Sequence, residues 1–200
     1  MINDNFQRAT PFESTKVAMH SAVRHPQFEP TENFKILVNQ WLAHCSKQIY
    51  IYGIPGNGKT TAMLWLYHHM VTLGLDVQYV SARDLVDKAR SCFTEGRSIS
   101  QMMDRFVNCG CLLLDDLGAE RLTDFTLFDV IYPLINHRLD RSPSLPTVIA
   151  SNLNFPTLLA KYSEIDPEES RRLVSRIIGN CAPIGFNSQS HRIASPTMWI

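Results

Sequence analysis

The sequence predicts an α/β protein in which a five-stranded, mainly parallel sheet is covered by helices on both faces. Apolar, strand-like runs alternate with amphipathic helical segments along the chain, which is the pattern of a parallel sheet. One run, "CLLLDD" at residues 111–116, ends in two acids, as expected of a strand buried on both faces. A glycine-rich stretch follows the first predicted strand, and this indicates a ligand site beyond the carboxyl end of that strand.

The size and composition of the chain fit one globular domain. Its 200 residues are 44% hydrophobic and 19% charged, which is ordinary for a protein with a self-sufficient core. We interpret residues 1–30 as an irregular lead-in and residues 31–200 as the domain. Because the net charge is zero, any attraction to nucleic acid must come from a local patch.

The cysteines and the first residues favour a cytoplasmic location. The five cysteines form an odd set without a CxxC pair, and the N-terminal stretch "MINDNFQRAT" lacks the apolar segment of a signal peptide. No apolar run approaches the roughly 20 residues that span a bilayer, so we expect no membrane association. Cys109 and Cys111 begin an apolar run, and we interpret them as small buried residues rather than metal ligands.

The first half of the domain reads as helix, strand, glycine loop, helix, strand and helix. Apolar residues recur at helical spacing over residues 31–45. "QIYIY" is then the first strand, a helix follows the glycine loop, and "VQYVS" is the second strand. Ser81 followed by Asp84 resembles a capping box, which opens a helix that runs toward Phe93.

The second half supplies the remaining three strands. A short helix around "SISQMMDRFVN" leads into the strand "CLLLDD". The stretch "TDFTLFDVIYPLINHRLD" predicts a long helix that is interrupted at Pro133. "PTVIASN" is the fourth strand, "ESRRLVSRIIGN" an amphipathic helix and "APIGF" the fifth strand.

Residues 53–60, "GIPGNGKT", satisfy the phosphate-loop pattern G-x-x-x-x-G-K-[ST] between a strand and a helix. Glycines let backbone N–H groups surround phosphate oxygens, and the helix N-terminus adds partial positive charge. We expect the Lys59 amine to point at the β- and γ-phosphates rather than into the core, and the Thr60 hydroxyl to ligate Mg²⁺. The ligand is thus a nucleoside triphosphate, and the predicted binding residues are Gly53, Pro55, Gly56, Asn57, Gly58, Lys59, Thr60 and Thr61.

Two acids and an amide follow predicted strands and complete a hydrolytic set. Asp115 would hold Mg²⁺ together with Thr60, and Asp116 would act as the general base or orient the attacking water. Asn152 ends the fourth strand, where an amide can orient water against the γ-phosphate. Alone, each is also typical of a solvated strand end or a turn. Their combination with the phosphate loop favours catalysis by Lys59, Asp116 and Asn152.

The last predicted helix carries Arg171, Arg172 and Arg176. Arg172 and Arg176 are four residues apart and share one face. An arginine donated to the γ-phosphate of a neighbouring subunit stabilises transition-state charge, whereas solvated helix charge is the alternative interpretation.

With "GIPGNGKT", "LLLDDLGAE", "LPTVIASN" and "RRLVSRI" in this order, the chain resembles the AAA+ ATPases of the bacterial helicase-loader family, the DnaC/DnaI type, over roughly residues 30–192. The resemblance implies a P-loop NTPase three-layer sandwich with strand order 5-1-4-3-2 and no full helical lid domain, with ATP and Mg²⁺ as cofactors. The roles that it implies are Walker A for Lys59 and Thr60, Walker B for Asp115 and Asp116, sensor 1 for Asn152, arginine finger for Arg176 with Arg172 second, and a sensor-2-like arginine for Arg192.

The resemblance also implies a DNA-replication factor that binds and hydrolyses ATP. Family members assemble on single-stranded DNA and load or remodel a replicative helicase, frequently in phage or prophage versions. The implied partners are a replicative helicase, single-stranded DNA bound weakly, and further copies of the chain through Arg176 and Arg172. Asp116 stands where many AAA+ proteins have the longer Glu, which predicts slow, assembly-dependent hydrolysis. Candidate DNA contacts are Arg83, Lys88, Arg90 and Arg97.

Other functions fit the same residues. A transposition helper ATPase of the IstB type has the same core and uses ATP to assemble on target DNA. A nucleotide-binding module that contacts a host helicase without useful turnover is a third interpretation. A small-molecule P-loop kinase fits less well, because no arginine-rich lid is evident between helices.

Overall fold

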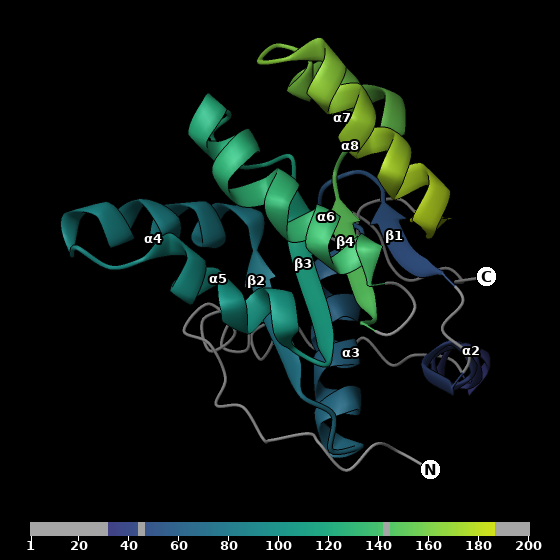
Figure 1. The fold of residues 1–200 in the computed structure, drawn as a ribbon. Helices are drawn as coiled ribbons and strands as arrows, with labels where there is room; N and C mark the ends of the chain where they lie inside the picture. The colour runs from purple at the N-terminus through teal and green to yellow at the C-terminus, as the bar shows by residue number, and fades with distance from the viewer. Residues whose placement is uncertain (1–31, 44–46, 142–144, 187–200) are drawn as a thin grey trace.

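The computed structural model describes residues 32–43, 47–141 and 145–186 (Figure 1). The predicted lead-in at residues 1–30 lies outside these ranges. Within them, no helix combines the length and the apolar character needed to cross a membrane. The elements are α2 (Glu32–Ala43), β1 (Gln48–Tyr52), α3 (Lys59–Thr72), β2 (Val77–Ser81), α4 (Ala82–Thr94), α5 (Ile99–Asn108), β3 (Cys111–Leu117), the π-helix η1 (Phe125–Ile131), α6 (Tyr132–Asp140), β4 (Thr147–Ser151), α7 (Phe155–Tyr162), α8 (Pro167–Asn180) and β5 (Cys181–Gly185).

The five strands form one parallel sheet in the order β2-β3-β4-β1-β5. This is the predicted order read from the opposite edge, so the predicted five-stranded parallel sheet and its strand order are confirmed. β4 lies between β1 and β3. The carboxyl ends of the glycine-loop strand, the asparagine strand and the acidic strand are therefore neighbours, which is where ligands bind in such sheets.

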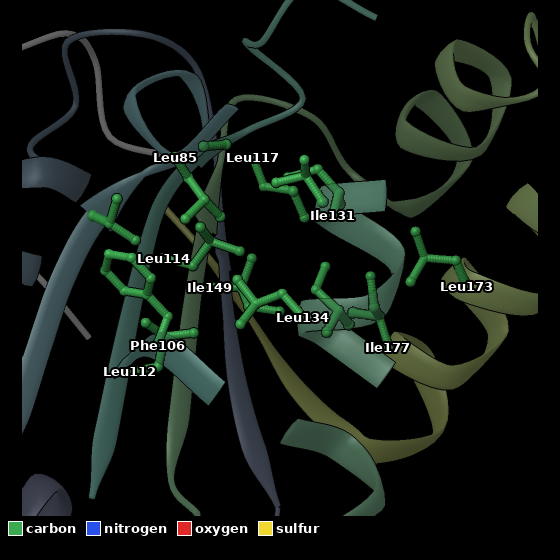
Figure 2. Packing of buried hydrophobic residues seen from close by; sticks show 14 of the residues in the cluster. Leu85, Phe106, Leu112, Leu114, Leu117, Ile131, Leu134, Ile149, Leu173 and Ile177 are labelled. Atoms are coloured by element: carbon green, nitrogen blue, oxygen red, sulfur yellow. The ribbon is translucent and has the colours of Figure 1, made fainter. Parts of the chain in front are cut away.

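Helices cover both faces of the sheet, because successive strand residues point to opposite sides. Leu112 and Leu114 of β3 are buried in a cluster with residues of α4, α5, α6 and α8. Figure 2 shows the two leucines near Phe106 of α5, with Leu173 and Ile177 of α8 at the far side of the cluster. Cys111 and Leu113 of the same strand belong to a second cluster with residues of α3. Cys111 and Leu113 therefore face α3, and Asp115 follows them on the same side of the strand.

Two helical features differ from the prediction. The helix before β4 is not interrupted at Pro133, because the chain stays helical through Ile131 and Pro133 falls in the first turn of α6. The winding changes there instead, from π-helix to α-helix. Helix α7 was not predicted, although Asn154 caps it by accepting a hydrogen bond from the Thr157 N–H at 3.0 Å.

Arg138 is a buried cation in the α6 layer, with 0% of its surface exposed. Its guanidinium donates to carbonyl oxygens of Phe106 at 3.1 Å, Cys109 at 2.9 Å and Pro146 at 2.6 Å. Its Nε also donates to the Thr147 hydroxyl at 2.8 Å. Arg138 thereby satisfies carbonyls at the end of α5 and at the entry to β4. Cys109, which contacts Arg138, and Cys111 are both buried, as predicted.

We expect Arg138→Met to lower the free energy of unfolding by roughly 3 kcal/mol, because several buried carbonyls lose their donor at once. The matched control is Arg141→Met, since Arg141 is exposed and donates to Asn108 at 2.7 Å near the same junction. Urea unfolding measures both variants. Arg141→Met should stay within about 0.5 kcal/mol of the wild type, and an equally small effect of Arg138→Met would contradict the structural role.

Candidate nucleotide site

The predicted phosphate loop connects β1 to the first turn of α3. Gly56 and Gly58 have φ of 85° and 92°, in the left-handed region that favours glycine. Gly58 is the N-cap of α3 and provides no side chain there, so the first N–H groups of the helix face the loop. A Cβ on Gly53 would lie 2.3 Å from the Phe186 carbonyl oxygen, so glycine alone fits. The backbone is thus shaped to surround an anion.

The Lys59 side chain folds back onto the phosphate loop. It is 4% exposed, and its amine donates to the carbonyls of Gly53 at 2.8 Å and Ile54 at 3.0 Å and to Asn57 Oδ1 at 3.2 Å. A buried ammonium needs acceptors, and the carbonyls of its own loop supply them. Burial lowers the pKa of Lys59, while the charges of Asp116 and then Asp115 act in the opposite direction. The amine thus lies within the phosphate loop and not in either apolar core, and its contact with the phosphates stays a prediction.

Asn57 connects the loop to the end of the sheet. Its side chain is 0% exposed and donates to the Phe186 carbonyl oxygen just after β5. Of the other predicted binding residues, Pro55 and Thr60 are exposed and Thr61 is half-buried. Arg192, predicted as a sensor-2-like arginine, lies outside the described residues.

Asp115 combines with Thr60 as a set of oxygen ligands for a metal ion. Asp115 is 1% exposed and points toward α3, whose first turn holds Thr60. The Thr60 hydroxyl, the Asp116 N–H and the Tyr79 hydroxyl all donate to its carboxylate. Burial and then the charge of Asp116 raise the pKa of Asp115, and these hydrogen bonds oppose the rise. A hydroxyl and two adjacent carboxylates fit a hard cation such as Mg²⁺.

Asp116 adopts an uncommon backbone conformation, with φ of 54°. The pairing of β3 with β4 is irregular between Leu114 and Leu117, so the strand bulges at the two acids. The turn that follows is closed by the Ala119 N–H, which donates to the Asp116 carbonyl at 2.9 Å. Because this irregular stretch contains both acids, their side chains are not bound to the alternation of a regular strand. The charges of both act on Lys59, that of Asp116 more strongly.

Asn152 is exposed directly after β4. The preceding residue, Ser151, fixes the local geometry: its carbonyl accepts from the Gly53 N–H at 3.3 Å and its hydroxyl donates to the Leu117 carbonyl at 2.5 Å. Ser151 therefore connects the ends of β1, β3 and β4. The fold brings Asn152, the phosphate loop and the acidic pair to one edge of the sheet.

The arginines of α8 lie elsewhere. Arg176 pairs with Asp140 at 2.6 Å, and α8 continues directly into β5, whose Cys181 pairs with Gln48 at the start of β1. Arg176 is therefore near the amino ends of the strands, opposite to the phosphate loop of its own chain. Arg172 pairs with Glu168 and Glu169 of its own helix, each at 2.5 Å.

Sequence reasoning missed two residues around the acidic strand. Tyr79 donates to Asp115 Oδ2 at 2.7 Å, but it reads as one more apolar residue of a buried strand. Glu120 is 2% exposed and accepts from the Gly118 N–H and the Tyr162 hydroxyl, each at 2.8 Å, so it supports the turn after β3. The unusual run "DDLGAE" was a signal for Glu120, whereas no sequence signal distinguished Tyr79.

Comparison with known proteins identifies the family of this chain. Residues 12–197 match the family described as IstB-like ATP binding protein. The chain belongs to this family. Among curated relatives of this IstB-like chain is the replicative helicase loader DnaI of Bacillus subtilis (strain 168), which is 25% identical over 151 residues. The match covers 73% of the chain and 48% of DnaI, so the chain spans about half the length of that relative.

Solved structures with the same fold include two replication proteins. The crystal structure of DnaI superposes with a TM-score of 0.68 at 20% identity, covering 89% of the IstB-like chain and 95% of the other. The replication initiator DnaA bound to AMPPCP and single-stranded DNA has a TM-score of 0.61 at 21% identity, covering 82% and 48% of the two chains. The predicted fold and family resemblance are confirmed, including a likeness to helicase loaders.

Proposed function

We propose that the chain is an ATP-hydrolysing, helicase-loader-like subunit that assembles on single-stranded DNA. The observation that carries this proposal is the meeting of the phosphate loop, the Thr60–Asp115 pair, Asp116 and Asn152 at one edge of the sheet. A glycine loop alone would support nucleotide binding. The acids beside it support hydrolysis as well.

In this proposal each residue has a separate task. The loop N–H groups hold the phosphates of ATP, and the Lys59 amine exchanges its carbonyl acceptors for phosphate oxygens. Thr60 and Asp115 would hold Mg²⁺, which supplies positive charge against the phosphate oxygens. Asp116 accepts the proton of the attacking water or orients it, and Asn152 holds that water toward the γ-phosphate.

Arg176 acts in this proposal on the nucleotide of a neighbouring subunit. Its position near the amino ends of the strands is opposite to its own phosphate loop, which supports action in trans. On assembly, Arg176 would leave Asp140 and bind the γ-phosphate of the neighbouring subunit's nucleotide. Exposed ion pairs contribute only about 0–1 kcal/mol, so this exchange costs little. Hydrolysis would thus depend on assembly.

Arginines around the turn after β3 support DNA binding. Arg83, Arg90 and Arg121 line a cavity of about 360 Å³ between α4 and this turn. Two acids also line it, but Asp87 lies 3.9 Å from Arg90, and Glu120 is buried and hydrogen-bonded. Phe93 is 66% exposed beside Phe125, with 5.3 Å between the ring centroids. Cations beside an exposed aromatic surface suit a single strand. The other two predicted DNA contacts, Lys88 and Arg97, line a separate cavity of about 410 Å³.

Fluorescence anisotropy with a labelled oligothymidine tests the DNA proposal. We expect weak binding that falls with salt and strengthens with a non-hydrolysable ATP analogue and Mg²⁺, because assembly aligns several weak sites. The Arg90→Ala/Arg121→Ala double variant should lower the slope of log affinity against log salt by about 1.4, since each lost phosphate contact on a single strand counts about 0.7. The control Arg141→Ala should retain the wild-type slope. An affinity for oligothymidine that does not change when nucleotide is added would contradict the proposal.

The family match favours one second candidate. Because the matched family is described as IstB-like, a transposition helper ATPase is the alternative proposal for the same ATP-driven assembly. Co-purification from the native host separates the two: a replicative helicase as the recovered partner supports the loader, and a transposase supports the helper.

A further inference from the structure

Tyr79 lies in the middle of β2, beside the acidic strand. It is 3% exposed and its hydroxyl donates to Asp115 Oδ2 at 2.7 Å. The contact follows from strand register, because Ser81 pairs with Asp115 and Tyr79 with Leu113. Val77 and Tyr79 of β2 and Cys111 and Leu113 of β3 lie in the apolar cluster on the α3 side of the sheet. Tyr79 therefore reaches the Asp115 carboxylate from the side of the sheet that also holds Thr60.

Both oxygens of the Asp115 carboxylate accept hydrogen bonds. Oδ2 accepts from Tyr79, and Oδ1 accepts from the Asp116 N–H at 2.9 Å. The Thr60 hydroxyl donates to the same carboxylate. A carboxylate held at both oxygens has little freedom to rotate about its Cβ–Cγ bond. Tyr79 supplies a donor from a different strand, β2.

We propose that Tyr79 is a positioning residue for Mg²⁺-dependent nucleotide binding, because it fixes the Asp115 carboxylate in the orientation that faces Thr60. This inference rests on the proposed function of the site as an Mg-ATP site. Partners that orient a metal-binding carboxylate typically contribute 10- to 100-fold to metal affinity. Loss of the Tyr79 hydroxyl should therefore weaken Mg²⁺ binding and leave the binding of the phosphates unchanged, because the loop and Lys59 hold the phosphates.

The variant that isolates this role is Tyr79→Phe, which removes one oxygen and keeps the ring in the core. Its matched control is Tyr162→Phe. Tyr162 is also fully buried and donates to a buried carboxylate, Glu120, at 2.8 Å, but Glu120 supports the turn after β3 rather than Thr60. Each variant removes a buried hydroxyl that donates to a buried carboxylate. Only one of these carboxylates, that of Asp115, is the proposed metal ligand.

The measurement is the fluorescence of mant-ATP on the full chain, first in EDTA and then during titration with MgCl₂. For Tyr79→Phe we expect the wild-type affinity for mant-ATP in EDTA. The Mg²⁺ concentration that produces half of the increase in mant-ATP affinity should be about tenfold higher than in the wild type. Tyr162→Phe should follow the wild type in both conditions. In an Asp115→Asn background, Tyr79→Phe should have no further effect on the Mg²⁺ dependence.

The other outcomes each overturn the inference. An unchanged Mg²⁺ requirement in Tyr79→Phe would show that the hydroxyl does not orient the ligand. A loss of affinity that is equal in EDTA and in Mg²⁺, or a variant that thermal unfolding finds unfolded, would assign Tyr79 a purely structural role. Wild-type affinity that does not respond to Mg²⁺ would overturn the Mg-ATP site itself, a failure visible without any variant.

Discussion

Lys59→Ala should raise the Kd for ATP at least about 100-fold, equivalent to about 2.7 kcal/mol, because a charged donor to the phosphates is lost. The Lys59 amine is buried within the loop and bonds three acceptors there, so it is already held where phosphates would bind. The fold should survive, since the acceptors that it leaves belong to the loop and not to either apolar core. Isothermal titration with ATP measures the effect, and circular dichroism checks the fold.

Lys161→Ala is the matched control for this variant. Lys161 also donates to a backbone carbonyl, that of Gly118 at 2.5 Å, in a turn near the same edge of the sheet. Its removal should leave the Kd within about twofold, because no phosphate contact is lost. Unchanged ATP affinity in Lys59→Ala would show that the assignment of the phosphate loop is wrong.

Arg176→Ala should reduce ATP turnover by a factor of about 1000 or more while ATP binding stays at the wild-type level, since an arginine finger stabilises charge that develops only in the transition state. The measurement is steady-state phosphate release at a protein concentration at which subunits associate. Binding of mant-ATP to the same preparation shows whether the nucleotide site is intact. A combined loss of binding and turnover would instead indicate a structural role.

Two control variants distinguish the loss of the arginine finger from the loss of its ion pair with Asp140. Asp140→Ala removes the same 2.6 Å pair and keeps the arginine, so it should retain turnover. Arg172→Ala removes an arginine that is paired within its own helix, and it should also retain turnover. If Arg172→Ala loses turnover and Arg176→Ala keeps it, the second predicted arginine is the finger.

Local motifs made the center of the fold predictable. The strand, the glycine loop and the helix around Gly53 and Lys59 follow from short-range rules. The glycines are required by the backbone of the loop, and the lysine is required by the phosphates that the loop surrounds. The continuous apolar run before Asp115 identified a central strand, since only burial on both faces favours it. The parallel sheet then brought Asn152 beside these residues without further information.

What the sequence did not predict depends on long-range contacts. Arg138 occupies the last turn of a helix and reads as a solvated charge, yet carbonyls from two other segments surround it. Tyr79 has its partner on a neighbouring strand. Asn57 connects the phosphate loop to Phe186 after β5, a contact that no local pattern encodes. Helix α7 is short, and its cap at Asn154 resembles a turn signal.

Subunit complementation tests most directly the claim that hydrolysis requires a neighbour. Lys59→Ala protein, which keeps its arginine but cannot hold ATP, is mixed with Arg176→Ala protein, which holds ATP but lacks the finger, and phosphate release is followed as the ratio is varied. We predict turnover in the mixture that neither variant shows alone, with a maximum at intermediate ratios. Absence of rescue at concentrations at which wild-type subunits demonstrably associate would contradict action in trans.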